Sequence, residues 1–328
     1  MVFWDMMPTT WVEKTSFLDQ TAPGINEMDK EGVLGTIITF PFQNHKIDAL
    51  YFHVDGYEDY SGTFPVILRL HGLLGNLLDD TEHDLPAILA THGYPSLTMN
   101  TLLANLGLFF GFGIFDDTMP QIDAACEHLQ NMGFRNIVIA GHGLGGCMAV
   151  RYAALQKDQA SHAGIQGVIA IATAYSLPDT IRKRWERFGS DPSYDEVNQK
   201  AKRLFHPGSS QDTNEDETIV VKRAHGDSLR PEHTEIYTLK TWWTLAGPEA
   251  DGPKTYRHIG SITVPILLVH GIHDDMIGVH ECEALAQLAR EAGNQDVTIR
   301  LLDAGHNLKG HHTELGATMA NWLGERFR

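Results

Sequence analysis

Short, almost wholly apolar runs alternate with amphipathic stretches along most of the chain. The runs 33–40 and 47–54 are predicted to be strands joined by a turn. Further strands are predicted at 65–71, 94–99, 136–140, 166–173, 264–270 and 297–302, and helices at 80–92, 116–131, 146–157, 279–293 and 312–326. Strands that are apolar on both faces are typical of a parallel sheet covered by helices. Their alternation with helices predicts a doubly wound, mostly parallel α/β fold.

The alternation breaks once, where charged and aromatic residues become more frequent. We therefore expect an N-terminal arm over 1–29, an α/β core over 30–175 and 260–328, and a mostly helical cap over 176–259. A cap would lie over the carboxyl ends of the strands, where open α/β sheets bind ligands. Trp242 and Trp243 supply aromatic surface that a solvated loop does not need. The alternative is a surface excursion with no part in binding.

Net charge excludes some classes of partner. The chain has 328 residues, with 25 Lys and Arg against 42 Asp and Glu, which gives a formal charge of −17. A negative field repels phosphate, so neither nucleic acid nor an anionic membrane surface is an expected partner. No stretch of about 18 apolar residues exists, so no membrane span is expected. The sequence does not indicate an oligomeric state.

Cysteine use and the N-terminal residues bear on the compartment. Cys126, Cys147 and Cys282 lie far apart and lack CxxC spacing, so we expect neither a disulfide framework nor a structural zinc site. A reducing compartment suits this pattern. The first residues show no basic segment followed by an apolar core, and so no signal peptide is predicted. We expect a cytoplasmic protein that needs no metal or other cofactor.

The motif GHGLGG, at 141–146, lies between a predicted strand and a predicted helix. Gly141, Gly143 and Gly146 match the dinucleotide fingerprint G-x-G-x-x-G. That fingerprint normally opens its domain and is followed by an acidic residue at the end of the next strand. Here several strands come first, and the next strand ends in IATAYS without a carboxylate. The same motif matches the nucleophile elbow G-x-S-x-G, with glycine in place of serine.

Three other features accompany a nucleophile elbow, and the sequence contains each of them. A glycine-rich turn with available backbone N–H groups follows the strand at 65–71, in the residues HGLLGN. Asp274 or Asp275 follows a late strand, and His306 follows the last one. The order nucleophile, acid, histidine is the order of the α/β-hydrolase fold.

These motifs together resemble the α/β-hydrolase superfamily, near its cap-bearing esterase, lipase and C–C hydrolase branches, over roughly 33–328. The resemblance implies that His306 is a general base oriented by Asp274. Asp274 is preferred to Asp275 because the family acid follows the HG pair after two residues. It also implies that the backbone N–H groups of Leu73 and Leu144 form an oxyanion hole.

Gly143 departs from the family, which has serine, or sometimes cysteine or aspartate, at that position. Glycine has no side chain, so no acyl-enzyme can form on it. Three explanations remain open: an introduced replacement of a native serine, a natural pseudo-hydrolase, or a site in which His306 activates water. Glycine suits the fold, because the elbow residue has a positive φ that costs other residues ~1–3 kcal/mol.

Other candidate residues have simpler interpretations. Cys147, inside the first helical turn, is interpreted as packing. His142 is expected to pack or to make a hydrogen bond beneath the cap. His311 and His312 lack the spacing and the carboxylate partner of a metal site, so we expect them to be solvated. Asp179 follows a strand and is expected to cap a helix.

The sequence thus predicts a hydrolase of a carboxylic ester or related acyl bond, nearly inactive because its nucleophile position is Gly143. The alternative is a catalytically silent protein that binds a small ligand in the same pocket. A small apolar acyl or ester ligand is suggested by an apolar cluster: Leu102, Leu103, Leu106, Leu108, Phe109, Phe110, Phe112 and Phe115. Packing between cap and core explains that cluster equally well.

Overall fold

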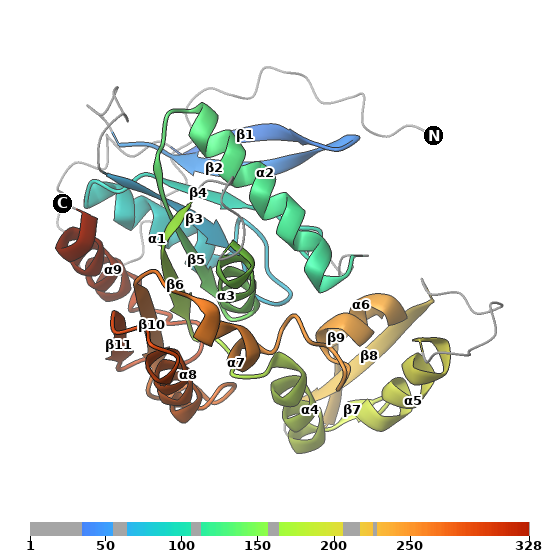
Figure 1. Cartoon of the computed structure of the whole chain (residues 1–328). Coiled ribbons are helices and arrows are strands. Elements are labelled where there is room, and N and C mark those ends of the chain that lie inside the picture. Colours follow the sequence, from blue (N-terminus) through green and yellow to red (C-terminus); the bar gives the residue numbers. More distant parts are fainter. Residues whose placement is uncertain are drawn as a thin grey trace. The chain divides into compact units, whose positions relative to one another are not determined.

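The fold is known from a computed structural model (Figure 1). It describes residues 35–54, 64–105, 113–156, 164–205, 217–225 and 228–327, without the side chains of 80–83 and 223–233. The predicted N-terminal arm therefore lies outside the described residues. So do five members of the apolar cluster, Leu106, Leu108, Phe109, Phe110 and Phe112.

A mixed sheet forms the centre of the described chain, with eight strands in the order β1-β2-β4-β3-β5-β6-β10-β11. The strands are β1 Gly35–Phe42, β2 His45–Phe52, β3 Pro65–Leu70, β4 Ser96–Met99, β5 Asn136–His142, β6 Ile165–Ile171, β10 Ile266–Gly271 and β11 Val297–Leu302. β1 and β2 pair antiparallel, β2 pairs antiparallel with β4, and the strands from β4 to β11 are parallel. The predicted mostly parallel α/β fold is confirmed.

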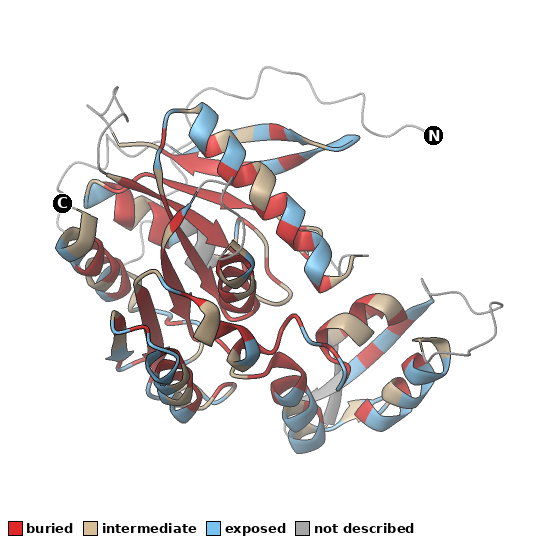
Figure 2. Ribbon diagram, viewed as in Figure 1, coloured by how far each residue is buried: buried red, intermediate tan, exposed pale blue. Residues whose placement is uncertain are grey.

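Apolar residues on both faces of the strands explain why helices cover both sides. Leu68 and Ile139 belong to one buried cluster, which includes residues of α2 (Thr118–Asn131), α3 (Leu144–Gln156) and α8 (Val279–Glu291). Ile67 and Val138, their neighbours in the chain, belong to a second cluster with α1 (Asp80–Thr91) and α9 (His312–Phe327). Neighbouring residues of a strand point to opposite faces, which produces the continuous apolar runs of the sequence. The central strands β3, β4, β5, β6 and β10 are accordingly buried almost throughout, as Figure 2 shows.

The inserted segment has more helix than strand, as expected, but it also contains a small sheet that was not predicted. It contains α4 (Leu177–Phe188), α5 (Tyr194–Phe205) and α6 (Leu239–Leu245), followed by the short α7 (Thr255–His258). It also contains a three-stranded antiparallel sheet of β7 (Ser190–Asp191), β8 (Thr218–His225) and β9 (Ser228–Thr238). Ile219 and Val221 are buried while Val220 is half exposed. Such alternation is typical of a strand with one buried face. It covers only a few residues among charged neighbours, so the sequence pattern did not predict the strand.

Two described members of the predicted apolar cluster pack in the core, since Leu103 and Phe115 are both buried there. For these two residues the packing interpretation holds. No helix within the described residues is long and apolar enough to cross a membrane.

Candidate active site

The turn between β5 and α3 has the shape of a nucleophile elbow. Gly143 stands at its tip with φ of 53°, in the left-handed region that residues with a side chain rarely adopt. Its N–H donates to the carbonyl of Ile171, and its own carbonyl accepts from the N–H of Gly146 at the start of the helix. The tip of the turn is thus anchored to the neighbouring strand and to the helix that follows.

The other glycines of the turn are required by close packing. A Cβ on Gly145 would lie 2.1 Å from the carbonyl oxygen of Leu70, and one on Gly141 would lie 2.1 Å from the carbonyl carbon of Gly145. A Cβ on Gly146 would lie 1.8 Å from the Thr173 hydroxyl oxygen. These distances are far inside van der Waals contact. The backbone of the turn therefore packs directly on β3 and on the chain after β6.

Gly143 has no such constraint. The nearest atom to a Cβ built on it is Nε2 of His306, at 3.8 Å, which is an ordinary contact. The space above Gly143 is therefore open to a side chain, and it faces the imidazole. The positive φ is what opposes a larger residue at this position.

His306 and Asp274 come together from two loops at the carboxyl ends of β10 and β11. Nδ1–H of His306 donates to Oδ2 of Asp274 over 2.8 Å, and the Asp274 side chain is fully buried. Oδ1 of Asp274 accepts from the backbone N–H groups of Met276 and Ile277, at 2.8 and 2.9 Å. The structure thus pairs His306 with Asp274 rather than with Asp275. With Nδ1 protonated, Nε2 of His306 is the basic nitrogen, and it faces Gly143.

A second histidine, which the sequence analysis used only as part of the HG pair before the acid, reaches the same carboxylate. His270, near the end of β10, places Nε2 3.2 Å from Oδ2 of Asp274 and 2.8 Å from the carbonyl oxygen of Ile277. Burial lowers the pKa of His270, but hydrogen bonds to Asp274, Cys282 and the Ile277 carbonyl outweigh it and raise the pKa to about 10. Burial likewise raises the pKa of Asp274, and the two histidines reverse that effect and lower it below its ordinary value. The carboxylate is therefore ionised at neutral pH.

Two further buried histidines support the loops around Gly143. Nε2–H of His142 donates to the carbonyl of His306 over 3.0 Å, and the two rings are 4.9 Å apart. Burial, followed by the nearby His306 charge, lowers the pKa of His142 to about 3. Nε2 of His71 accepts from the hydroxyl and the N–H of Thr101, and burial lowers its pKa to about 4. Both side chains are neutral, and His142 makes the hydrogen bond that the sequence allowed for.

The two backbone N–H groups expected to bind an oxyanion lie beside this site. Leu73 follows β3 in a turn closed by the Gly75 N–H donating to the Gly72 carbonyl, and Leu144 is the first residue of α3. Within the described part of the chain, neither Leu73 N–H nor Leu144 N–H donates to a backbone carbonyl. Both residues line the same cavity as Gly143. The N-terminus of a helix is favourable for an anion, since its first N–H groups lack intrahelical partners.

A cavity of about 830 Å³ connects these groups with the inserted segment. It is lined by Gly72, Leu73, Leu74, Leu78, Asp79, His142, Gly143, Leu144, Leu177, Thr180, Ile181, Arg184, Asp275, Met276, Ile277, His306, Asn307, Lys309 and His312. α4 contributes four of these residues, so the first helix of the insertion faces the candidate site. Gly143, His306 and part of the predicted cap thus share one cavity, and Asp274 lies behind His306 rather than in the lining.

The remaining sequence candidates lie as follows. Cys147 is buried, accepts a hydrogen bond from the Thr255 hydroxyl, and has a pKa raised to about 11 by burial. His311 pairs with Glu314, but the expectation that His312 is solvated is wrong, because its side chain is 11% exposed and lines the cavity. Asp179 lies in the first turn of α4 rather than at its N-cap, which is Ser176. No cluster able to hold a metal ion occurs among the described residues.

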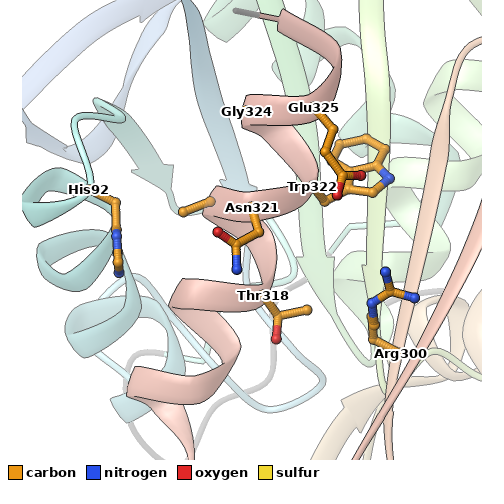
Figure 3. A pocket seen from close by; sticks show the side chains of 8 residues that line it. His92, Arg300, Thr318, Asn321, Trp322, Gly324 and Glu325 are labelled. Carbon is orange, nitrogen blue, oxygen red and sulfur yellow. The ribbon is translucent and has the colours of Figure 1, made fainter.

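Another cavity, of about 580 Å³, lies among α1, β11 and α9 (Figure 3). His92, Arg300 and Asn321 are among the polar residues around it. It is separate from the His306 site, since the two cavities share no lining residue.

Comparison with known proteins adds a family and a set of similar folds. The family model described as serine aminopeptidase S33 matches residues 107–309. None of the curated proteins searched matches the sequence.

Three solved structures illustrate the similarity in fold. Est1E from Butyrivibrio proteoclasticus has 13% identity and a TM-score of 0.59, over 88% of this chain and 98% of that chain. The Pyrococcus furiosus esterase Pf2001 has 13% identity and a TM-score of 0.60, over 90% and 92%. The Paleococcus ferrophilus monoacylglycerol lipase has 16% identity and a TM-score of 0.58, over 86% and 100%. At such identities the likeness is one of fold.

Proposed function

Since the chain belongs to the α/β-hydrolase family described as serine aminopeptidase S33, we propose that it hydrolyses a carboxylic ester or a related acyl bond. The observation that carries the proposal is the geometry at Gly143. The His306–Asp274 pair directs its basic nitrogen toward Gly143, where a built Cβ would lie 3.8 Å from Nε2. Backbone N–H groups of Leu73 and Leu144 border the same cavity.

The nucleophile in this proposal is water. The described lining of the cavity contains neither a serine nor a cysteine, and Gly143 has no side chain. A water molecule in the space above Gly143 would be within reach of Nε2 of His306. Of the three explanations that the sequence left open, this one gives the intact base a use in the chain as it stands.

The reaction then proceeds through one tetrahedral intermediate. His306 takes a proton from water through Nε2 while the water oxygen bonds to the acyl carbon, and the carbonyl π electrons move to oxygen. The N–H groups of Leu73 and Leu144 stabilise that oxyanion. The intermediate collapses, the bond to the leaving oxygen breaks, and the His306 imidazolium returns its proton to the leaving alkoxide. Asp274 holds the tautomer and stabilises the imidazolium.

The rate expected from such a site is low. Sites that lack one member of a catalytic triad typically retain about 10³–10⁴-fold acceleration over water, from the oxyanion hole and binding. We therefore expect a slow enzyme that hydrolyses activated esters and does not react with serine-directed phosphonates.

We expect the acyl group of the substrate to be small and apolar and to bind in this cavity. Leu73, Leu74, Leu144, Leu177 and Ile181 line the cavity. Esterases and a lipase are among the proteins with a similar fold, which supports an ester as the bond cleaved.

The second candidate function is ligand binding without catalysis, and the absence of a side chain at Gly143 favours it. The same cavity would then hold a small apolar ligand. The two functions predict different effects of variants at His306, because only catalysis needs its basic nitrogen.

Hydrolysis of a panel of p-nitrophenyl esters tests the proposal with two variants. Gly143→Ala places a methyl group where water is expected, and His306→Ala removes the base. We expect each to abolish the slow hydrolysis of the unaltered chain, while a phosphonate label read by mass spectrometry finds no adduct. Hydrolysis that survives both substitutions, or a covalent adduct, would refute the water mechanism. Unchanged folding is checked by circular dichroism.

A further inference from the structure

The Asp274 carboxylate has an unusually complete set of hydrogen-bond donors. Within the described chain it accepts from His306, His270 and the N–H groups of Met276 and Ile277. A carboxylate offers about four lone-pair sites, so its accepting capacity is filled. The two histidines share one oxygen, Oδ2, at 2.8 and 3.2 Å.

His270 also fixes the turn that carries the acid. Its Nε2–H bonds to the Ile277 carbonyl, the Ile277 N–H bonds to Oδ1 of Asp274, and Oδ2 of Asp274 lies beside His270 again. These contacts close a ring over the turn from β10 to α8. The carboxylate therefore cannot rotate without breaking contacts on both of its oxygens.

The other ring nitrogen of His270 has a partner as well. Nε2 is occupied by Asp274 and Ile277, and the remaining hydrogen bond joins His270 to the buried thiol of Cys282 on α8. A side chain that is 1% exposed and has polar partners for both nitrogens is held in one orientation. The raised pKa of His270 means that this side chain is an imidazolium at neutral pH.

We propose that His270 is a positioning residue, which holds the Asp274 carboxylate in place for His306. Its imidazole contacts Oδ2, the same oxygen that accepts the Nδ1–H of His306. The role deepens the proposed function and rests on it for the part that His306 plays as base. The consequence is a carboxylate that keeps Oδ2 directed at Nδ1 of His306.

Of the side chains around Asp274, His270 and His306 are the two whose hydrogen bonds lower the pKa of its carboxyl group. Removing His270 therefore takes away one of the two side-chain donors to Oδ2 and leaves His306 as the other.

Nuclear magnetic resonance of the full chain with ¹⁵N-labelled histidine tests the proposal without any need for turnover. His270→Gln retains an N–H donor near the position of Nε2 and removes the charge. We expect the downfield Nδ1–H resonance of His306 to persist in this variant, because a donor still holds the Asp274 carboxylate. His270→Leu, which removes the donor too, is expected to broaden or abolish the downfield Nδ1–H resonance of His306.

A matched control is available three residues further on. His273 is 66% exposed and pairs with Asp303 at 2.7 Å, so His273→Gln removes a histidine from the same loop without touching Asp274. It should leave the downfield Nδ1–H resonance of His306 unchanged. Loss of that resonance in the control, or its full retention in His270→Leu, would overturn the proposal.

The unaltered chain provides a test that survives any failure of the variants to fold. His270 should remain doubly protonated from pH 5.5 to 8.5, and titration of His270 near its ordinary value of 6.5 would refute the proposal. Loss of the proposed function would look different. In that case the esters would not be hydrolysed, although the histidine resonances would still behave as described.

Discussion

Gly143→Ser is the substitution that the candidate site accommodates most directly. The Cβ of the new residue would stand 3.8 Å from Nε2 of His306, and that ring is what it would meet within 4 Å. A hydroxyl one bond further on, in a staggered rotamer turned toward the ring, comes within a hydrogen-bond distance of about 3 Å. The substitution therefore supplies a nucleophile already paired with a base.

Backbone strain opposes this gain. The φ of 53° at Gly143 suits glycine, and a residue with a side chain there loses ~1–3 kcal/mol of stability. Gly143→Ala carries the same strain and has no hydroxyl, so it is the matched control. We expect both variants to melt a few degrees below the unaltered chain and to differ little from each other.

Catalysis separates the two variants. We expect Gly143→Ser to hydrolyse short-chain p-nitrophenyl esters at least ~10²-fold faster than the unaltered chain, a small part of the ~10⁶ of an optimised triad. It should also take up one phosphonate, located at position 143 by mass spectrometry. A folded Gly143→Ser that is neither labelled nor active would refute the hydrolase interpretation and leave the binding protein.

Other measurements probe the packing, the buried histidines and the buried thiol. Gly145→Ala should lose more than ~4 kcal/mol of stability, because its Cβ would lie 2.1 Å from a backbone oxygen. Gly133→Ala meets no atom within 4 Å and should lose only the smaller cost of its φ of 102°. Chemical denaturation compares the two variants, and equal losses of stability would contradict the packing argument. Because burial lowers the pKa of His71, the folded chain should lose about 3 kcal/mol of stability as the pH falls from 6.5 toward about 4. His71→Asn should reduce this loss. If the free energy of unfolding depends on pH equally in both proteins over that range, the argument is excluded. Cys147, buried and with its pKa raised to about 11, should resist iodoacetamide in the folded chain and react once denatured, as mass spectrometry would show.

The elements of the sheet could be predicted because their apolar runs are buried on both faces. This pattern predicted the strand that leads into GHGLGG and the strand that leads into HGIHDD. In the structure the loops after both strands lie beside His306. Parallel strands align their carboxyl ends. The resemblance to α/β hydrolases then implied that Gly143, Asp274 and His306 would meet.

Contacts that depend on side-chain direction could not be predicted in this way. His270 is an apolar-strand residue by position, and its bond to Asp274 depends on the exact turn that follows β10. His312 is the first residue of α9, a position that is often solvated, yet it lines the cavity. The pairing of β8 with β9 was missed because its alternation covers few residues.

The unequal crowding of the turn glycines has a consequence for how this site can change over generations. A Cβ at Gly141, Gly145 or Gly146 collides with neighbouring atoms, so selection for a folded chain alone preserves those three positions. At position 143 no atom opposes a side chain, so only the modest cost of the positive φ favours glycine there. Glycine and serine codons can differ by a single base. A lineage could therefore lose and regain its hydroxyl in one mutational step while the rest of the turn stayed fixed. The structure separates the part of the motif kept by folding from the part kept only by chemistry.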